Sequence, residues 1–302
     1  MFQLFATALV TVALFPAGVV IMKQVIVAGV FVVLIFTLMA FGVRPVTEPL
    51  PDFAVCLYNG KGSLAKSVEG VKSSLKTYSD IKIQEVSESD IINGKLKGCR
   101  VLIIPGGTAS GEREALGAAG CRAIENFVSS GGGYIGICAG AYLVPLSERQ
   151  SAANIQLINA RLHDSEHWVR GEQTIECSAL TRGNSKTTPF QIHFQNGPIF
   201  VPGKDPYLPE YTCLAKYETD LHAPDAPAGQ MAGNDAIIAS RFGKGRVILF
   251  GPHPELTPGL EPMLAQAARW AASLSEPQTT ALGPEFSWEG IFGLTPIHTK
   301  KK

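Results

Sequence analysis

Residues 131–140 read GGGYIGICAG, and this short segment is the most informative part of the chain. A glycine-rich turn leads into an apolar run with the composition of a buried β-strand, and the run ends at Cys138. Glycines stand two residues to either side of the cysteine, at Gly136 and Gly140. A nucleophile on a sharp strand-to-helix turn occupies strained backbone, and only small neighbours let the chain close there. The segment therefore predicts a thiol presented at the carboxyl end of a strand.

Cys138 has two interpretations, a reactive thiol and a buried core residue. A free cysteine is most often buried as a small apolar side chain. Core burial, however, does not require glycines at both flanking positions, whereas the sharp turn does. The first free N–H groups of a following helix would also favour the thiolate over the thiol. We therefore favour the reactive interpretation.

Strands and helices alternate on the amino-terminal side of Cys138. We expect helices over about residues 63–78 and 112–129. Because the strands between them lack a polar face, they indicate an α/β fold with a mostly parallel sheet covered on both sides. Ligand sites in such sheets gather at the carboxyl ends of the strands. The predicted strands are residues 54–58, 81–86, 101–104 and 134–137.

The carboxyl-terminal half is less regular. A last helix is expected over about residues 262–274, and residues 276–302 are expected to form a loose tail. Candidate strands are residues 155–162, 173–177, 189–194, 236–242 and 246–250, the last two joined as a hairpin by Gly243-Lys244-Gly245.

The second strand of that hairpin delivers the sequence GPHPE. A thiolate that attacks an acyl carbon needs a base or ion-pair partner, and that partner needs an orienting acceptor. His253 and Glu255 are two residues apart, so an extended backbone would project both to the same side. Glu255 would then hold the imidazole while His253 faces Cys138. The backbone N–H groups of Ala139 and Gly107 are the candidate donors to a developing oxyanion.

The amino-terminal residues 1–45 differ from the rest of the chain. Two apolar runs, residues 2–22 and 25–43, each approach the roughly 20 residues that span a bilayer. One interpretation is a tight hairpin of two spans. Another takes Met22 as the start of a single anchor, which stays uncleaved because its apolar part is longer than that of a cleaved signal.

Residues 1–45 are thus predicted to be a membrane anchor in contact with lipid, and residues 46–51, which carry prolines, a linker. If Lys23 lies on the cytoplasmic side, the domain that follows is extracytoplasmic. Arg44 argues weakly for the opposite orientation.

The composition excludes some classes of partner. Twenty-six basic residues balance twenty-six acidic ones, so we expect no nucleic-acid partner. The six cysteines form no CxxC pair and do not identify the compartment. His163 and His167 stand four apart among carboxylates but lack the His-Glu-x-x-His order, so no metal or other cofactor is expected. His193 is assigned to a strand rather than to catalysis.

Three features together resemble the class I glutamine amidotransferase-like superfamily: an apolar strand entering Pro105-Gly106-Gly107, the GICAG turn, and the HPE segment. Within it, GGGYIGICAGAY is most similar to the N-terminal domain of eukaryotic biotin–protein ligases and to its free-standing bacterial relatives. Tyr58-Asn59-Gly60 and Asn196-Gly197-Pro198 also resemble loops of that subfamily. The resemblance covers roughly residues 52–274.

The resemblance implies a flavodoxin-like three-layer sandwich over residues 52–275, with a Cys138–His253–Glu255 triad. It also implies an oxyanion hole at Gly107 and Ala139. The substrate-binding residues that it implies are Asn59, Gly106, Tyr142 and Asn196.

One departure from that family bears on the substrate. Class I amidotransferases usually carry a glutamine four residues after the nucleophile, where this chain has Tyr142. No synthetase or biotin-ligase segment follows residue 275 here, so we expect neither ammonia transfer nor biotinylation by the chain itself. The favoured function is a membrane-anchored cysteine hydrolase that cleaves a small-molecule amide or a peptide bond through an acyl-thioester. The alternative is a non-catalytic accessory domain that acts beside a membrane-protein partner.

Overall fold

The computed structural model describes residues 52–145, 155–163, 171–181, 188–224, 227–273 and 282–293. The predicted membrane anchor and linker lie outside these residues. Among the helices of the described ranges, none combines the length and the apolar character needed to cross a bilayer.

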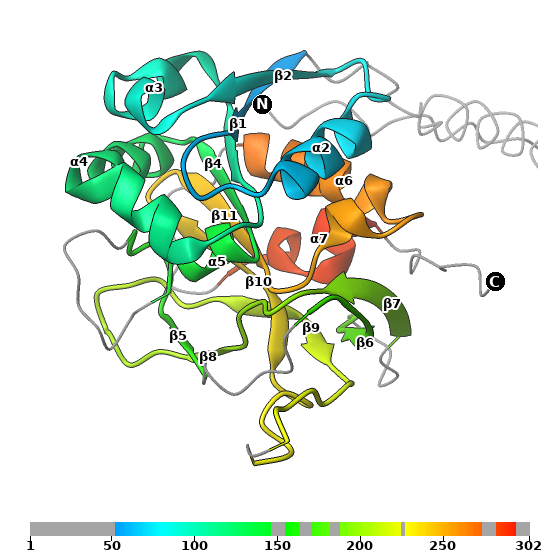
Figure 1. Cartoon of the computed structure of the whole chain (residues 1–302). Helices are drawn as coiled ribbons and strands as arrows, with labels where there is room; N and C mark the ends of the chain where they lie inside the picture. Colours follow the sequence, from blue (N-terminus) through cyan, green and yellow to red (C-terminus); the bar gives the residue numbers. More distant parts are fainter. Residues whose placement is uncertain are drawn as a thin grey trace, which may run out of the picture. The chain divides into compact units, whose positions relative to one another are not determined.

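Five parallel strands form one half of the sheet: β1 (Phe53–Tyr58), β2 (Ile81–Val86), β3 (Val101–Ile104), β4 (Gly133–Ile137) and β11 (Gly245–Phe250). Their order is β2-β1-β3-β4-β11, so β4, which ends in the predicted nucleophile, lies in the interior of the sheet (Figure 1). Since all five run in the same direction, their carboxyl ends meet at one edge, where α/β proteins build their sites.

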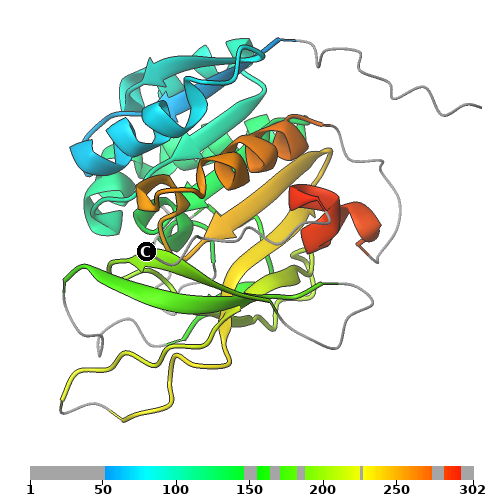
Figure 2. The same cartoon turned by 90° about the vertical axis from the view of Figure 1, so that its right-hand side faces the viewer.

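Antiparallel strands extend the same sheet beyond β11. The hairpin partner β10 (Asp235–Phe242) pairs with β11, and β9 (Thr212–Tyr217), β6 (Gln173–Ala179) and β7 (Thr188–Phe194) follow in that order. Two short strands, β5 (Ala160–Leu162) and β8 (Phe200–Pro202), pair with one another, and β8 also pairs with β10. Figure 2 shows this part below the parallel half.

Helices cover both faces of the parallel half. Residues of α2 (Ala65–Leu75), α6 (Glu261–Ala272) and α7 (Trp288–Phe292) share one apolar core with Val101 and Ile103 of β3. Residues of α3 (Glu88–Ile92) and α4 (Ala109–Ser129) share the other core with Leu102 and Ile104. The alternation follows from the two-residue period of a strand, and it explains why these strands are apolar throughout. Figures 1 and 2 show the two helical layers on opposite sides of the sheet.

The sequence predicted the elements of the parallel half closely and those of the antiparallel half only in part. The four amino-terminal strands, the hairpin of β10 and β11, and the cores of β6 and β7 are confirmed. The expectation of a mostly parallel sheet holds from β2 to β11 but not beyond. Polar residues alternate with buried ones in β6 and β7, which is the pattern of antiparallel strands with one solvated face.

The prediction of a loose tail from residue 276 is wrong for residues 282–293. A 3₁₀ turn, η3 (Pro284–Phe286), and helix α7 pack on the domain, with the side chains of Phe286, Trp288 and Phe292 buried. The indole N–H of Trp270 in α6 donates to the carbonyl of Glu285 at 2.7 Å. Aromatic side chains bury large apolar areas, which is enough to hold a short segment against the core.

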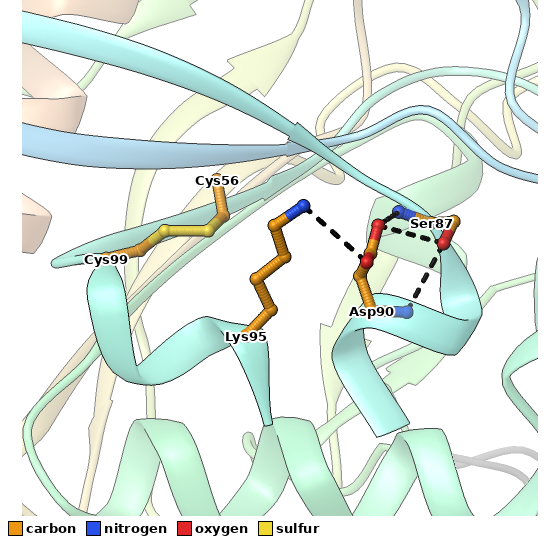
Figure 3. The surroundings of a disulfide bond; sticks show 5 residues. All are labelled: Cys56, Ser87, Asp90, Lys95 and Cys99. Atoms are coloured by element: carbon orange, nitrogen blue, oxygen red, sulfur yellow. Dashed lines mark hydrogen bonds and ion pairs between the residues drawn. A yellow bond between two sulfur atoms is a disulfide. The ribbon is translucent and has the colours of Figure 1, made fainter. Parts of the chain in front are cut away.

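A disulfide joins Cys56 in β1 to Cys99, which lies just before β3 (Figure 3). Their Cα atoms are 5.8 Å apart, and the bond closes a loop of 43 residues in sequence separation. Nearby, Ser87 and Asp90 form a capping box at the start of α3. The sequence analysis left the pairing of the cysteines open. Among the described residues, Cys121, Cys138, Cys177 and Cys213 are free.

Candidate active site

Cys138 occupies the sharp turn between β4 and α5 (Ala139–Tyr142), as the glycine pattern predicts. Its φ of 48° lies in the left-handed region, which is strained for a residue with a side chain. A Cβ on Gly136 would lie 2.6 Å from the carbonyl oxygen of Gly140, and one on Gly140 would collide with the carbonyl of Ile104. Both glycines are therefore required by close backbone approach. The whole residue Cys138 is only 6% exposed.

His253 and Glu255 stand beside Cys138 because β4 and β11 are parallel neighbours. The Cys138 N–H donates to the carbonyl of Phe250 at 2.9 Å, so the chain leaves both strands at the same edge. His253 Nδ1 lies 2.7 Å from Glu255 Oε1, and both side chains are buried. The prediction of an extended backbone between His253 and Glu255 is wrong. Glu255 lies in a 3₁₀ turn, η2 (Pro254–Leu256), and it is this turn that brings its carboxylate back to the imidazole.

The charges around His253 favour the imidazolium. Burial alone lowers the pKa of His253, but the charge of Glu255, the nearby Cys138 and the hydrogen bond to Glu255 raise it to about 10. No hydrogen bond of ordinary geometry reaches the buried Nε2 atom within the described residues. The thiol of Cys138 instead donates to the carbonyl of Gln195 at 3.4 Å. The sulfur thus influences the imidazole by proximity rather than through a well-formed hydrogen bond.

The turn after β3 forms the second side of the site. Gly106 and Gly107 are held by the preceding turn, since Leu64 N–H donates to Gly106 at 2.9 Å and Thr108 N–H donates to Gly62 at 2.8 Å. Within the described residues, the N–H groups of Gly107 and Ala139 make no hydrogen bond. Gly107 is exposed and Ala139 is only 1% exposed. Their role as oxyanion donors stays a prediction.

The remaining predicted residues lie in different places. The phenol of Tyr142 donates to the carbonyl of Asn196 at 3.0 Å, next to the Gln195 carbonyl that faces Cys138. Asn196 has a φ of 52°, and its buried Oδ1 has no partner among the described residues. The side chain of Asn59, by contrast, is exposed and donates to Glu85 at 2.7 Å.

Three functional candidates were missed by the sequence analysis. Ser67 of α2 is fully buried, and its hydroxyl donates to Glu255 Oε1 at 2.6 Å. His193 of β7 was assigned to a strand, which is confirmed, yet its ring lies edge-on to His253 with centroids 5.5 Å apart. Glu112 of α4 is fully buried without a hydrogen-bond partner among the described residues. Ser67 directly precedes Val68 on α2 and both are buried, but no local pattern in the sequence indicates a polar contact for the serine.

Within the described residues, no cluster of three or more histidine, cysteine or acidic side chains has the arrangement of a metal site. His163 Nε2 lies 2.9 Å from Gln230 Oε1, and the rest of the predicted His163–His167 pair lies outside the described residues.

Comparison with known proteins places these features in a family context. The family model described as "Biotin-protein ligase, N terminal" matches residues 53–149 and 164–280. An uncharacterized protein of Chlamydia muridarum is 30% identical over 172 residues, which are 53% of this chain and 61% of that protein. The biotin–protein ligase of Schizosaccharomyces pombe is 26% identical over 185 residues, which are 54% of this chain and 27% of that protein. The matches thus span less than two thirds of both relatives.

Solved structures with a similar fold belong to several kinds of protein. A ThuA-like protein from Bacteroides uniformis has a TM-score of 0.47 and 15% identity, covering 74% of this chain and 94% of that chain. The β-galactosidase of Bacillus circulans has a TM-score of 0.43 and 13% identity, covering 67% of this chain and 28% of that chain.

Proposed function

This chain belongs to the biotin-protein ligase N-terminal family, and from that premise we propose that it is a cysteine hydrolase that cleaves an amide or peptide bond. One observation carries the proposal: a buried imidazole lies between a carboxylate at 2.7 Å and a cysteine held in a strained strand-to-helix turn. A domain that only binds a partner has no need of all three groups.

The proposed reaction begins with the Cys138 thiolate and the His253 imidazolium, which Glu255 stabilises. The sulfur attacks the acyl carbon of the substrate, and the Gly107 and Ala139 N–H groups donate to the oxyanion that forms. His253 then gives its proton to the leaving amine, which departs as the C–N bond breaks and a thioester remains on Cys138. A water molecule, deprotonated by His253, cleaves the thioester to release the acid and restore the thiolate.

The substrate class is proposed from the residues around the thiol. Tyr142 stands where class I amidotransferases usually carry glutamine, and its phenol is directed to the Asn196 carbonyl. Tyr142 at the end of α5 would contact the substrate together with Asn196 and Gly106, and Asn59 would do so only after leaving Glu85. We therefore propose an amide or peptide other than free glutamine.

The fold and the location complete the proposal. The strand order β2-β1-β3-β4-β11 is that of flavodoxin-like folds, and we propose that the domain is a three-layer sandwich of that type. Residues 1–45 would anchor it to a membrane, with the domain outside the cytoplasm. The Cys56–Cys99 disulfide supports this location because disulfides persist in oxidising compartments. Finding these two thiols reduced after trapping with N-ethylmaleimide in intact cells would contradict it.

The proposed function is tested by alkylating the purified full-length protein with iodoacetamide and following the Cys138 peptide by mass spectrometry from pH 5 to 10. We expect His253→Ala to slow alkylation at pH 6 by about tenfold or more and to have little effect at pH 9.5. An ordinary thiol is protonated at pH 6 unless a cationic neighbour favours the thiolate, whereas at pH 9.5 it ionises without one. Screening of amide substrates would then use Cys138→Ala as the inactive control.

A non-catalytic accessory domain is the second candidate, favoured by the closed state of the site. Cys138 is 6% exposed and His253 is 2% exposed, and the Cys138 thiol donates a hydrogen bond to the Gln195 carbonyl. A Cys138 alkylation profile that is the same with and without His253 would support this candidate and refute the hydrolase.

A further inference from the structure

A chain of buried hydrogen bonds connects the two sides of the candidate active site through helix α2. Gly106 N–H donates to Ser67 Oγ at 2.8 Å, and the Ser67 hydroxyl donates to Glu255 Oε1 at 2.6 Å. The same Oε1 atom lies 2.7 Å from His253 Nδ1. One hydroxyl therefore joins the turn that carries the oxyanion donor to the carboxylate that holds the imidazole.

The Glu255 carboxylate depends unusually strongly on these contacts. Its Oε2 atom is buried and has no hydrogen-bond partner among the described residues, so both donors converge on Oε1. Without the hydroxyl, His253 would be the single hydrogen-bonding contact that sets the rotation of the carboxylate. Hydrogen bonds to a charged, buried acceptor are stronger than those between neutral groups, so the loss is expected to be large.

Two glycines, Gly70 on α2 and Gly106 on the facing turn, allow close packing around the Ser67 hydroxyl. A Cβ on Gly70, one turn after Ser67, would lie 2.8 Å from the carbonyl oxygen of Glu255 and 3.0 Å from its Cγ. The absence of a side chain at this position thus lets η2 lie directly on the helix. On the other side, a Cβ on Gly106 would lie 2.5 Å from Cε1 of His253 and 3.2 Å from Ser67 Oγ.

We propose that Ser67 is a positioning residue that sets the orientation of the Glu255 carboxylate, and through it His253, together with the position of the Gly106–Gly107 turn. Gly106 N–H is committed to Ser67, which leaves the neighbouring Gly107 N–H free for the oxyanion. The proposal rests on the proposed thiol chemistry of Cys138. Ser67 couples the His253 imidazole to the Gly106–Gly107 turn, a connection that Cys138, His253 and Glu255 do not provide.

The experiment compares full-length variants by the pH profile of Cys138 alkylation. Ser67→Ala removes both hydrogen bonds, and we expect alkylation at pH 6 to fall by about tenfold while the rate at pH 9.5 stays within about twofold. Ser74→Ala is the matched control, because it removes the same atom from another buried serine two turns along α2. It should leave the profile unchanged.

Two further arms separate positioning from structural support. Threonine and valine side chains have nearly the same shape, but only threonine keeps the hydroxyl. Cys138 in Ser67→Thr should therefore be alkylated as in the native protein, and Cys138 in Ser67→Val as in Ser67→Ala. This pair also serves if the alanine variant does not fold. In a His253→Ala background, Ser67→Ala should cause no further loss, because both act through the same imidazole.

The outcomes distinguish this inference from the proposed function. If Cys138 reactivity depends on His253 but the Thr and Val variants behave alike, Ser67 only fills space and the inference falls while the proposed function stands. If native Cys138 is indifferent to His253, the proposed function falls, and this inference falls with it. If the Val variant alone loses reactivity at pH 6, both stand.

Discussion

Two buried carboxyl groups flank the Gly106–Gly107 turn, and they are held in opposite ways. Glu255 lies on the α2 side, where Oε1 meets Ser67 and His253 at 2.6 and 2.7 Å. Glu112 lies on the α4 side, where neither oxygen has a hydrogen-bond partner among the described residues. The two glycines of the turn face these two environments: a Cβ on Gly106 would meet His253, and a Cβ on Gly107 would lie 3.0 Å from Glu112 Oε1.

The difference shows how burial and neighbouring donors act on the pKa of a carboxyl group. A carboxylate with an adjacent cation and a hydroxyl donor can stay ionised in the interior, as proposed for Glu255. Burial without compensation raises the pKa of Glu112 to about 9, with the charge of Arg113 opposing this only weakly. Glu112 is therefore a neutral acid at pH 7. One side of the turn holds a carboxyl paired with the His253 imidazole, whose pKa is raised, and the other holds a carboxyl with no partner among the described residues.

Removing the hydrogen-bonded carboxyl of Glu255 should change the protein most. Glu255→Ala leaves the His253 imidazolium buried without its partner, and we expect the free energy of unfolding at pH 6 to fall by about 3–5 kcal/mol. The folded pKa of His253 is raised to about 10, so its stabilisation is fully present below about pH 6.5 and is lost as the pH rises toward 10. The destabilisation measured by urea unfolding should accordingly be larger at pH 6 than at pH 10.

Glu69→Ala, an exposed carboxylate on α2, is the control for this variant and should change stability by less than about 1 kcal/mol. A Glu255→Ala protein as stable as the control at pH 6 would show that the His253–Glu255 pair is not charged.

The second effect tests the neutral carboxyl. The folded pKa of Glu112 is raised above its unfolded value of about 4.3, so its contribution is favourable at low pH and declines as the pH rises toward 9. The native protein should lose roughly 1.4 kcal/mol per pH unit from this group between about pH 5 and 9. Glu112→Gln should remove that slope, which urea unfolding at pH 5.5 and 7.5 can measure.

Glu114→Gln is the matched control, since Glu114 lies on the same helix with its side chain 72% exposed. It should leave the slope intact. Equal slopes for Glu112→Gln and the native protein would mean that the Glu112 carboxyl finds a donor or water in solution.

The third prediction uses the two glycines to perturb one side at a time. Gly106→Ala would press on the imidazole, whereas Gly107→Ala would press on the Gly62 carbonyl and on Glu112. Each should cost about 1–3 kcal/mol by overpacking. Gly106→Ala should change the pH profile of Cys138 alkylation more than Gly107→Ala does. The reverse order would mean that the turn, rather than the imidazole, yields to the added methyl group.

The smallest expected effect is at Asn59, on the preceding loop. Its side chain is exposed and donates to Glu85 at 2.7 Å. Asn59→Ala should therefore change stability by no more than about 0.5 kcal/mol and leave Cys138 alkylation unchanged. A marked loss of reactivity would show that Asn59 moves toward the thiol and would support its predicted contact with substrate.

The parallel half of the fold and the three residues at the centre of the candidate site could be predicted from sequence alone. Local signals were sufficient there: buried parallel strands are apolar throughout, and the turn at Cys138 requires small residues at fixed spacing. The alternation of strands and helices placed Cys138 at a strand end. The antiparallel half was predicted only in part because its short strands depend on partners far along the chain.

The contacts that support the candidate site emerge only from the packing of distant segments. Ser67 is separated from Glu255 by 188 residues, and no local pattern distinguishes a serine that meets a carboxylate from one that fills a helix. The different surroundings of Glu255 and Glu112 depend on which donors the folded chain brings within reach. Burial and hydrogen bonding are properties of the packed molecule, so the charge of a side chain follows from its neighbours in space rather than in sequence.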